Sequence, residues 1–191
     1  MGVWVWVVII VVAVVVVGAA AWMLGSRRRT RYLKGRFGPE YDRTARRSDG
    51  RRQAEAELVA RERRRNRLEI RPLSEPMRER YAARWEDVQA GFVDAPDAAV
   101  EQADQLVSQV MSERGYPMDD FDQRAADISV DHPVVVENYR AAHRVYVAVR
   151  EGDASTEEER QAMRHYRSLF DELLAAAAGD SARSTERTGI Q

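Results

Sequence analysis

The side chains best suited to catalysis or metal binding are three histidines, His132, His143 and His165. Two of them, His143 and His165, flank the apolar faces of expected helices and would approach one another if those helices are neighbours. A protein zinc site takes three or four ligands, and no spacing supplies a third one here. The favoured interpretation is therefore that all three are surface or capping residues, with His132 at a helix start.

Acidic residues offer a second set of candidates. Asp119, Asp120 and Asp122 resemble a calcium loop, but the glycine at the sixth position and the glutamate at the twelfth are missing. Glu137 does not stand out as an acid–base group among the many carboxylates. Asn138 lies beside an apolar stripe, which predicts a buried hydrogen-bonding residue. The chain also lacks cysteine, phosphate-binding glycine loops and the GxSxG and HExxH motifs. We therefore expect no enzyme activity, no cofactor and no metal site.

Basic residues raise the question of nucleic acid. The stretch Arg61–Arg71 reads RERRRNRLEIR, in which Glu62 and Glu69 interrupt the positive charge. Binding of single-stranded nucleic acid usually combines such charge with aromatic side chains for base stacking, and none is interleaved here. We expect no nucleic-acid partner.

The element that must position everything else is the apolar run at residues 3–24, VWVWVVIIVVAVVVVGAAAWML. As a helix, 22 residues extend roughly 33 Å, enough for a hydrocarbon core of about 30 Å. In lipid a helix satisfies its own backbone groups, which a lone strand of these β-branched residues cannot do. The run predicts a transmembrane helix, with Trp4, Trp6 and Trp22 near its two interfaces.

Basic residues follow the run and none precedes it. The six are Arg27, Arg28, Arg29, Arg31, Lys34 and Arg36. The positive-inside rule then predicts an N-terminus outside, residues 1–2, and a C-terminal domain in the cytoplasm of a single-pass protein. A cleaved signal peptide with export is the alternative, since Ala19–Ala21 offers small residues, but the basic n-region of such a peptide is missing.

The remaining chain divides by charge. Residues 25–71 hold 17 basic and 7 acidic side chains, whereas residues 72–191 hold 13 and 24. The first segment is predicted to be a basic juxtamembrane stalk in contact with anionic headgroups, where each exposed Lys or Arg contributes about 1 kcal/mol. The second contains an acidic helical bundle at 72–178 and a disordered tail at 179–191.

The pattern of the soluble part predicts an all-α fold without internal repeats. Gly38-Pro39 is a break, Pro39–Arg47 a short helix, and Arg51–Ile70 a charged helix that is either a free stalk or packed along one seam. Four amphipathic helices then form a small antiparallel bundle. Their apolar residues are, in order, Met77, Tyr81, Trp85, Val88 and Phe92; Ala99, Val100, Ala103, Leu106, Val107, Val110 and Met111; Val135, Tyr139, Ala142, Val145, Tyr146 and Val149; and Met163, Tyr166, Leu169, Phe170, Leu173 and Leu174.

Capping residues set the expected helix limits. Ser74 begins the first bundle helix, Gly115, Gly152 and Gly179 end later ones, and Thr156 to Glu159 forms a capping box. Asp119–Ile128 is predicted to be a short helix or a connector. Ser129 or Asp131 would cap a helix that Pro133 opens, and Ile128–Asp131 is the one stretch where a strand is conceivable.

Four strings carry a resemblance to known sequences: LKGRFGPEYDR at Leu33–Arg43, IRPLSEPMRERYAARW at Ile70–Trp85, MSERGYP at Met111–Pro117 and SVDHPVVVENYRAAH at Ser129–His143. The chain resembles a family of uncharacterised bacterial proteins with one N-terminal span and a helical soluble domain, often labelled only membrane or secreted protein. The resemblance implies this architecture but no activity, cofactor or catalytic residue.

The sequence therefore predicts a membrane-tethered, non-enzymatic helical interaction or scaffold domain at the cytoplasmic face of a bacterial membrane. Its protein partner is not identified by the residues, and self-association stays open. An anionic-lipid-responsive module is the alternative, followed by an exported envelope protein and by an enzyme using His132, His143 or Glu137.

Overall fold

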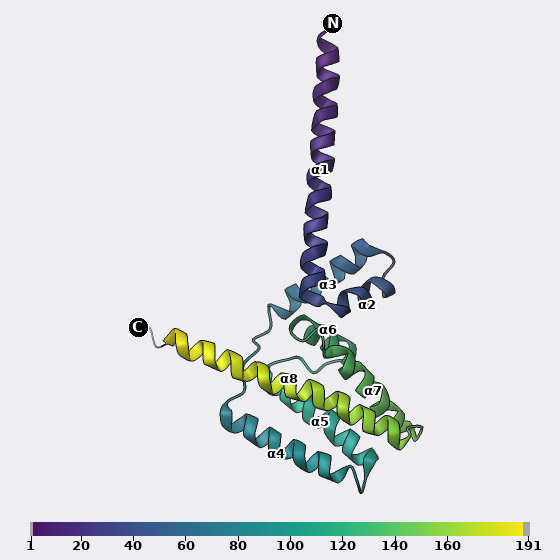
Figure 1. The fold of residues 1–191 in the computed structure, drawn as a ribbon, viewed down its shortest axis with the longest axis vertical. Helices are drawn as coiled ribbons and strands as arrows, with labels where there is room; N and C mark the ends of the chain where they lie inside the picture. Colours follow the sequence, from purple (N-terminus) through teal and green to yellow (C-terminus); the bar gives the residue numbers. More distant parts are fainter. Residues whose placement is uncertain (1, 189–191) are drawn as a thin grey trace. The chain divides into compact units, whose positions relative to one another are not determined.

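The computed structural model describes the backbone of residues 2–188, and the side chains of that range except several positions within 3–22 and all positions after 175. This part of the chain is all-α, without a strand, so the conceivable strand at Ile128–Asp131 is wrong. Its eight helices are α1 (Val3–Phe37), α2 (Pro39–Arg47), α3 (Arg51–Arg65), α4 (Glu75–Gly91), α5 (Pro96–Arg114), α6 (Phe121–Asp131), α7 (Val136–Glu151) and α8 (Thr156–Thr188) (Figure 1).

The chain forms two compact units, Met1–Leu58 and Val59–Gln191, and the division falls within α3. The first unit contains α1, α2 and the start of α3. Its buried apolar residues are Leu33, Phe37, Tyr41, Ala54 and Leu58. The predicted short helix Pro39–Arg47 is confirmed by α2, which begins at Pro39 after a turn at Gly38, where φ is +47°.

Helix α1 is longer than the apolar run, and it continues without a break through Gly25 and Ser26 to Phe37. The apolar run and the basic segment therefore form one helix. A single glycine inside a helix costs only about 1 kcal/mol. The hydroxyl of Ser26 donates to the carbonyl of Met23 one turn earlier, at 3.1 Å, and so stays within the helix.

The apolar run itself exposes its described side chains. Trp4 is 71% exposed, Val14 66% and Val17 67%. No helix in the described part of the chain combines the length and the apolar character needed to cross a membrane. The transmembrane assignment of 3–24 thus stays a prediction.

Helix α3 ends at Arg65, five residues before the expected end at Ile70. The backbone amides of Arg67 and Leu68 donate hydrogen bonds to carbonyl oxygens three residues earlier and so close a final turn. The linker that follows has no regular secondary structure; its Leu73 belongs to the core of the second unit, and Leu68 and Ile70 pack against that core. An amide–carbonyl bond of 2.8 Å from Arg71 to Arg114 ties the linker to the end of α5.

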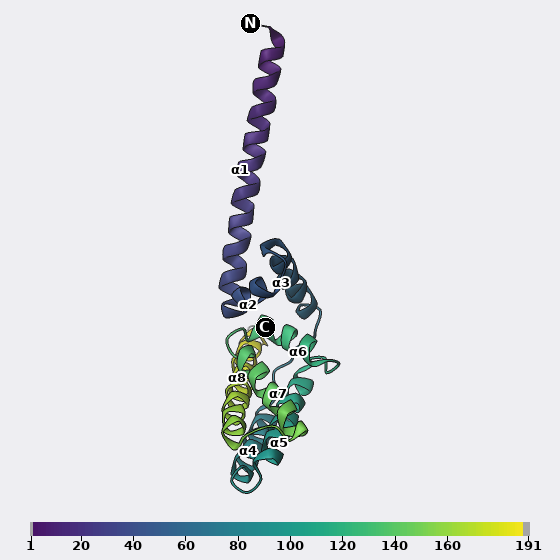
Figure 2. The same ribbon diagram turned by 90° about the vertical axis from the view of Figure 1, so that its right-hand side faces the viewer.

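The second unit is a bundle of the four predicted helices, with α6 added at one end. Short turns join α4 to α5 and α7 to α8, while α8 lies against both α7 and α5 (Figure 2). The predicted apolar faces are confirmed, because every residue of the α5 set is buried and those of the other three helices are buried or partly buried against the core. Trp85 of α4 stacks on Phe170 of α8 with ring centroids 4.8 Å apart.

Several predicted limits of the bundle helices need correction. The capping box lies one residue earlier than predicted: the Ser155 amide donates to the Glu158 carboxylate at 2.9 Å, and the Glu158 amide donates back to the Ser155 hydroxyl at 3.4 Å. Ser74 occupies the N-cap position of α4, but its side chain makes no capping bond. Gly115 and Gly152 end α5 and α7 as predicted, in the left-handed region.

The limits of α6, α7 and α8 also differ from expectation. Helix α6 is capped by Asp120 and runs to Asp131, so neither Ser129 nor Asp131 caps a following helix. The residues around Pro133 form a turn, and α7 begins only at Val136. Helix α8 continues past Gly179 to Thr188, whereas residues 189–191 of the predicted tail lie outside the described residues.

Candidate functional site

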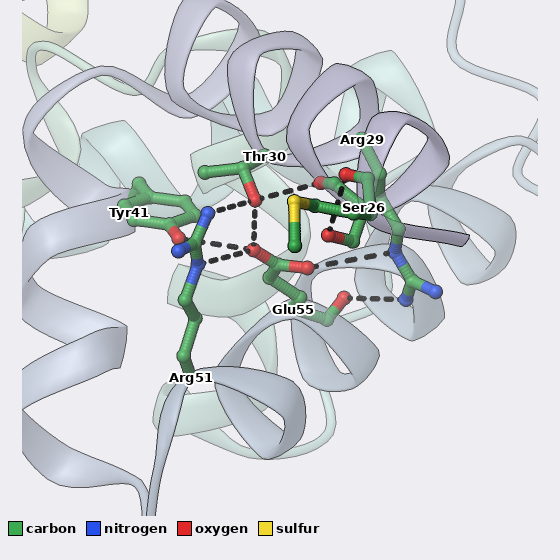
Figure 3. A network of polar contacts seen from close by, with 7 residues as sticks. Ser26, Arg29, Thr30, Tyr41, Arg51 and Glu55 are labelled. Atoms are coloured by element: carbon green, nitrogen blue, oxygen red, sulfur yellow. Dashed lines mark hydrogen bonds and ion pairs between the residues drawn. The ribbon is translucent and has the colours of Figure 1, made fainter. Parts of the chain in front are cut away.

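The most connected polar group of the first unit is the carboxylate of Glu55, which is only 7% exposed. Its Oε1 atom accepts hydrogen bonds from the hydroxyl of Thr30 at 2.6 Å, the hydroxyl of Tyr41 at 3.2 Å and Nε of Arg51 at 3.0 Å (Figure 3). Arg51 also donates to the Thr30 hydroxyl. One carboxylate therefore connects α1, α2 and α3.

Helical spacing places these groups together. Thr30, Leu33 and Phe37 lie at positions i, i+3 and i+7, which form a single buried stripe on α1. On α3, Glu55 lies between the buried Ala54 and Leu58. Thr30 and Glu55 are therefore buried beside these apolar side chains and have little contact with water.

Electrostatics favour the charged form of this carboxyl group. Burial on its own raises the pKa of Glu55, but hydrogen bonds from Thr30, Arg51 and Tyr41 lower it by more, and the pKa lies below its ordinary value. Burial and the nearby carboxylate raise the pKa of Tyr41. Tyr41 therefore remains a neutral donor and Glu55 a charged acceptor at neutral pH.

The basic residues predicted to meet the membrane all lie on exposed surface of α1. They are Arg27, Arg28, Arg29, Arg31, Lys34 and Arg36. Two have partners within the unit. Arg29 donates to the backbone carbonyl of Glu55 at 3.3 Å, and its Nε lies 3.9 Å from the carboxylate. The Lys34 ammonium lies 5.2 Å from the centroid of the Tyr41 ring. The segment is thus an ordered helical surface.

The tryptophans of the predicted interfaces are described only in part. Trp4 is exposed, whereas the side chains of Trp6 and Trp22 lie outside the described residues. A hollow of about 560 Å³ adjoins the basic helix surface and is lined by Gly25, Ser26, Arg29, Arg52, Glu55 and Ala56. Two guanidinium groups on this lining suit an anionic group.

Sequence reasoning missed Thr30, Tyr41 and Glu55. The stripe Thr30, Leu33 and Phe37 was a visible signal, because it repeats at helical spacing inside the basic segment. The i,i+4 spacing of Arg51 and Glu55 was another. Neither signal names Glu55 as the shared acceptor, since its partners Thr30 and Tyr41 stand 25 and 14 residues earlier in the chain.

Contacts within the second unit show that the C-terminal part of the charged helix α3 is not a free stalk. Arg61 donates to the hydroxyl of Ser129 at 3.4 Å, and Nε of Arg64 lies 3.2 Å from the Asp127 carboxylate. Nε of Arg65 lies 2.7 and 2.6 Å from the two oxygens of Asp131. The residues of α3 after Leu58 thus pack on α6, and three of the arginines considered for nucleic acid are engaged within the unit.

The histidines have different surroundings from those expected. His132 ends α6, is 5% exposed and pairs through Nδ1 with Glu172 at 3.2 Å, so it is a buried residue and not a surface one. Its Nε2 is buried without a partner in the described part of the chain. Burial lowers the pKa of His132, and the bond to Glu172 only partly opposes this effect.

The other two histidines do not form a joint site. His143 stacks on Phe121 at a centroid distance of 3.6 Å and lies 3.5 Å from the Asp104 carboxylate, which also accepts from the buried Tyr166 hydroxyl at 2.7 Å. His165 is half-buried, and burial lowers its pKa. Among the described residues, no hydrogen bond, ion pair or ring contact joins His143 and His165.

The remaining candidates have structural partners. Asp120 of the suspected calcium loop accepts from the amides of Asp122 and Gln123 and so caps α6. Asn138 donates to the Ser168 hydroxyl at 3.1 Å, which confirms the predicted hydrogen bond, but it is half-buried and not buried. Among the described residues, no three His or carboxylate side chains gather as metal ligands would.

Comparison with known proteins finds no relative. No protein-family model, no curated protein and no solved structure matches this chain. The resemblance to bacterial single-pass proteins therefore stays an expectation, and a functional hypothesis depends on the chain's own residues.

Proposed function

We propose that the protein is a membrane-tethered, non-enzymatic helical interaction or scaffold domain at the cytoplasmic face of a bacterial membrane. The observation that carries the proposal is the composition of α1, in which an apolar run of 22 residues is followed by six basic residues within positions 27–36. Leaving such a run in water costs about 25 cal/mol for each Å² of apolar surface. Insertion in a bilayer removes this cost.

The Glu55 cluster supports a tethering role. It holds the basic end of α1 against α2 and α3, so that a folded unit directly follows the proposed span. The bundle that follows it in the chain offers exposed surface to a partner, while His132 and His143 pair with carboxylates within the bundle. We infer that its partner is a protein.

Insertion is tested by charging the middle of the run. Val12→Arg with Val15→Arg places two guanidinium groups near the bilayer centre, each costing about 2.5–3.5 kcal/mol. The double variant should leave the alkali-resistant membrane fraction, whereas Val134→Arg, at a position 73% exposed in the bundle, should remain in it. Retention of the double variant in that fraction would refute a transmembrane anchor.

Orientation is tested by fusing a topology reporter after Gln191. A fluorescent protein that folds only in the cytoplasm should be bright, and alkaline phosphatase at the same site should be inactive. The reverse pattern would show export and exclude a cytoplasmic scaffold. Photo-crosslinking from the exposed Val147 then tests for a partner. A specific crosslinked protein is the expected result, and its absence would argue against a scaffold role for this face.

An anionic-lipid-responsive module is a second candidate, favoured by the hollow that Arg29 and Arg52 line. In nanodiscs, anionic lipid should slow amide exchange at the start of α3 relative to zwitterionic lipid, and salt should reverse the effect. Exchange that is independent of lipid charge would leave only the tethering role.

A further inference from the structure

A second hollow lies in the bundle between the end of α4 and the first half of α8. Its volume is about 340 Å³, at the small end of the range of roughly 300–1,000 Å³ for small-molecule pockets. The lining residues are Trp85, Gln89, Phe92, Arg160, Met163, Arg164 and Arg167. All belong to the second unit, so the hollow is independent of the proposed membrane anchor.

The apolar part of the lining is firmly held. Trp85 is 1% exposed and stacks on Phe170, while Met163 is 7% exposed and Phe92 is partly buried. The indole N–H of Trp85 is buried and has no acceptor within the described part of the chain.

The rest of the lining is largely cationic. Arg160, Arg164 and Arg167 lie at i, i+4 and i+7, which places three positive charges on one face of α8. Like charges at this spacing destabilise a helix by about 0.2–0.5 kcal/mol for each pair. In a segment where 24 acidic residues outnumber 13 basic ones, such a row is unexpected.

The three arginines are not equally neutralised. Arg160 contacts Glu157, and Arg167 pairs with Asp171 at 2.8 Å, each about one turn away along α8. Arg167 also reaches Gln89 at 3.4 Å and lies 5.8 Å from the centroid of the Trp85 ring. Arg164, in the middle of the row, has no ion pair among the described residues. The hollow therefore combines an apolar wall with an uncompensated positive charge.

We propose that this hollow binds a small amphipathic monoanion, with its apolar body against Trp85 and Met163 and its carboxylate against Arg164. The head must be anionic because the rim is cationic. The body must be apolar because the wall offers aromatic and thioether surface. The small volume favours a short aryl or acyl carboxylate over a larger ligand.

The test uses 4-phenylbutyrate as the probe and the full chain in nanodiscs of zwitterionic lipid. Trp85 is the only tryptophan after residue 24, so Phe replacements of Trp4, Trp6 and Trp22 make its fluorescence specific for the hollow. The expected result is a saturable change with 4-phenylbutyrate and none with the neutral 4-phenylbutyramide at the same concentration. Empty nanodiscs correct for partition of the probe into lipid.

Matched variants locate the head group. Arg164→Gln should weaken binding at least fivefold, whereas Arg150→Gln, which removes one exposed arginine of α7, should change it less than twofold. In ¹³C-methyl spectra, the Met163 signal should shift on binding and that of the fully buried Met111 should not. Equal binding of acid and amide, equal affinity of the two variants, or a non-saturable signal would each overturn the proposal.

Discussion

Replacing Glu55 by glutamine is the most informative perturbation of the first unit. The variant keeps the size of the side chain but removes the charge that Thr30, Tyr41 and Arg51 share. The glutamine oxygen still accepts one or two of these bonds, while its amide adds a donor where only donors stand already. The expected consequence is local loosening of α3 against α1 and α2.

The size of the effect follows from the exposure of each donor. Hydrogen bonds to a charged group contribute about 1.5–3 kcal/mol, and neutral ones about 0.5–1.5 kcal/mol. The bonds from Thr30 and Tyr41 are buried, so each should lose about 1 kcal/mol. The Arg51 side chain is 60% exposed, and its surface ion pair adds only a few tenths of a kcal/mol. The total is about 2 kcal/mol.

Amide hydrogen exchange measures this opening directly. In nanodiscs at neutral pH, the amides of Ala54–Leu58 should exchange about 30-fold faster in Glu55→Gln, since 1.36 kcal/mol corresponds to tenfold. The control is Glu57→Gln on the exposed side of the same helix, which should change the rates less than about threefold. Equal rates in wild type and Glu55→Gln would refute the stabilising role of the carboxylate.

The same carboxylate gives the first unit a defined acid response. The folded pKa of Glu55 is lowered from 4.5, so its stabilising contribution is complete above that pH and is lost as the pH falls through the folded value. Protection of α3 in the wild type, corrected for intrinsic exchange, should fall below about pH 4.5. Glu55→Gln should lack this component, and parallel pH profiles of the two proteins would contradict it.

Three further predictions concern the second unit. Burial, and then the neighbouring Asp97, raise the pKa of Glu159 to about 7. The stability of the bundle should therefore fall as the pH rises from about 4.5 through 7, and thermal melts of Glu159→Gln should lack that fall. Gly115→Ala should lower the free energy of unfolding by at least 2 kcal/mol in urea titrations, because φ is +94° and the new Cβ would lie 2.5 Å from a linker carbonyl oxygen. The control Gly152→Ala should cost only about 1–2 kcal/mol, because no atom lies within 4 Å of its new Cβ. Arg65→Ala should speed proteolysis within α3, because it removes the short ion pair between Arg65 and Asp131 of α6. Replacing the exposed Arg63 by alanine should not speed it. Equal cleavage of the two variants would show that the ion pair does not hold the helix.

The apolar faces of the bundle were predictable, because burial at helical spacing is a local property of the sequence. Every residue of the α5 set from Ala99 to Met111 is buried, and Gly115 ends that helix where expected. Limits set by competing signals were less predictable. Ser155 and Thr156 are both good capping residues, and only the position of the first turn shows that Ser155 acts with Glu158.

Polar interactions between distant segments were beyond the local pattern. Glu55 looked like one acid in a basic helix, since nothing nearby indicates Thr30 or Tyr41 as partners. His132 was assigned to a helix start because Pro133 suits a first turn. Proline fixes its own φ but does not oblige the next residues to continue as a helix, and here the chain turns and leaves His132 buried at the end of α6.

The continuity of α1 fixes a rotational phase between its two parts. Each residue of an α-helix advances about 100° around the axis. With no break at Gly25 or Ser26, the buried stripe of Thr30, Leu33 and Phe37 therefore keeps a constant angle to the apolar run before it. One alanine inserted at this junction would turn the residues around Glu55 by about 100° relative to the apolar run, and four would nearly restore the original facing.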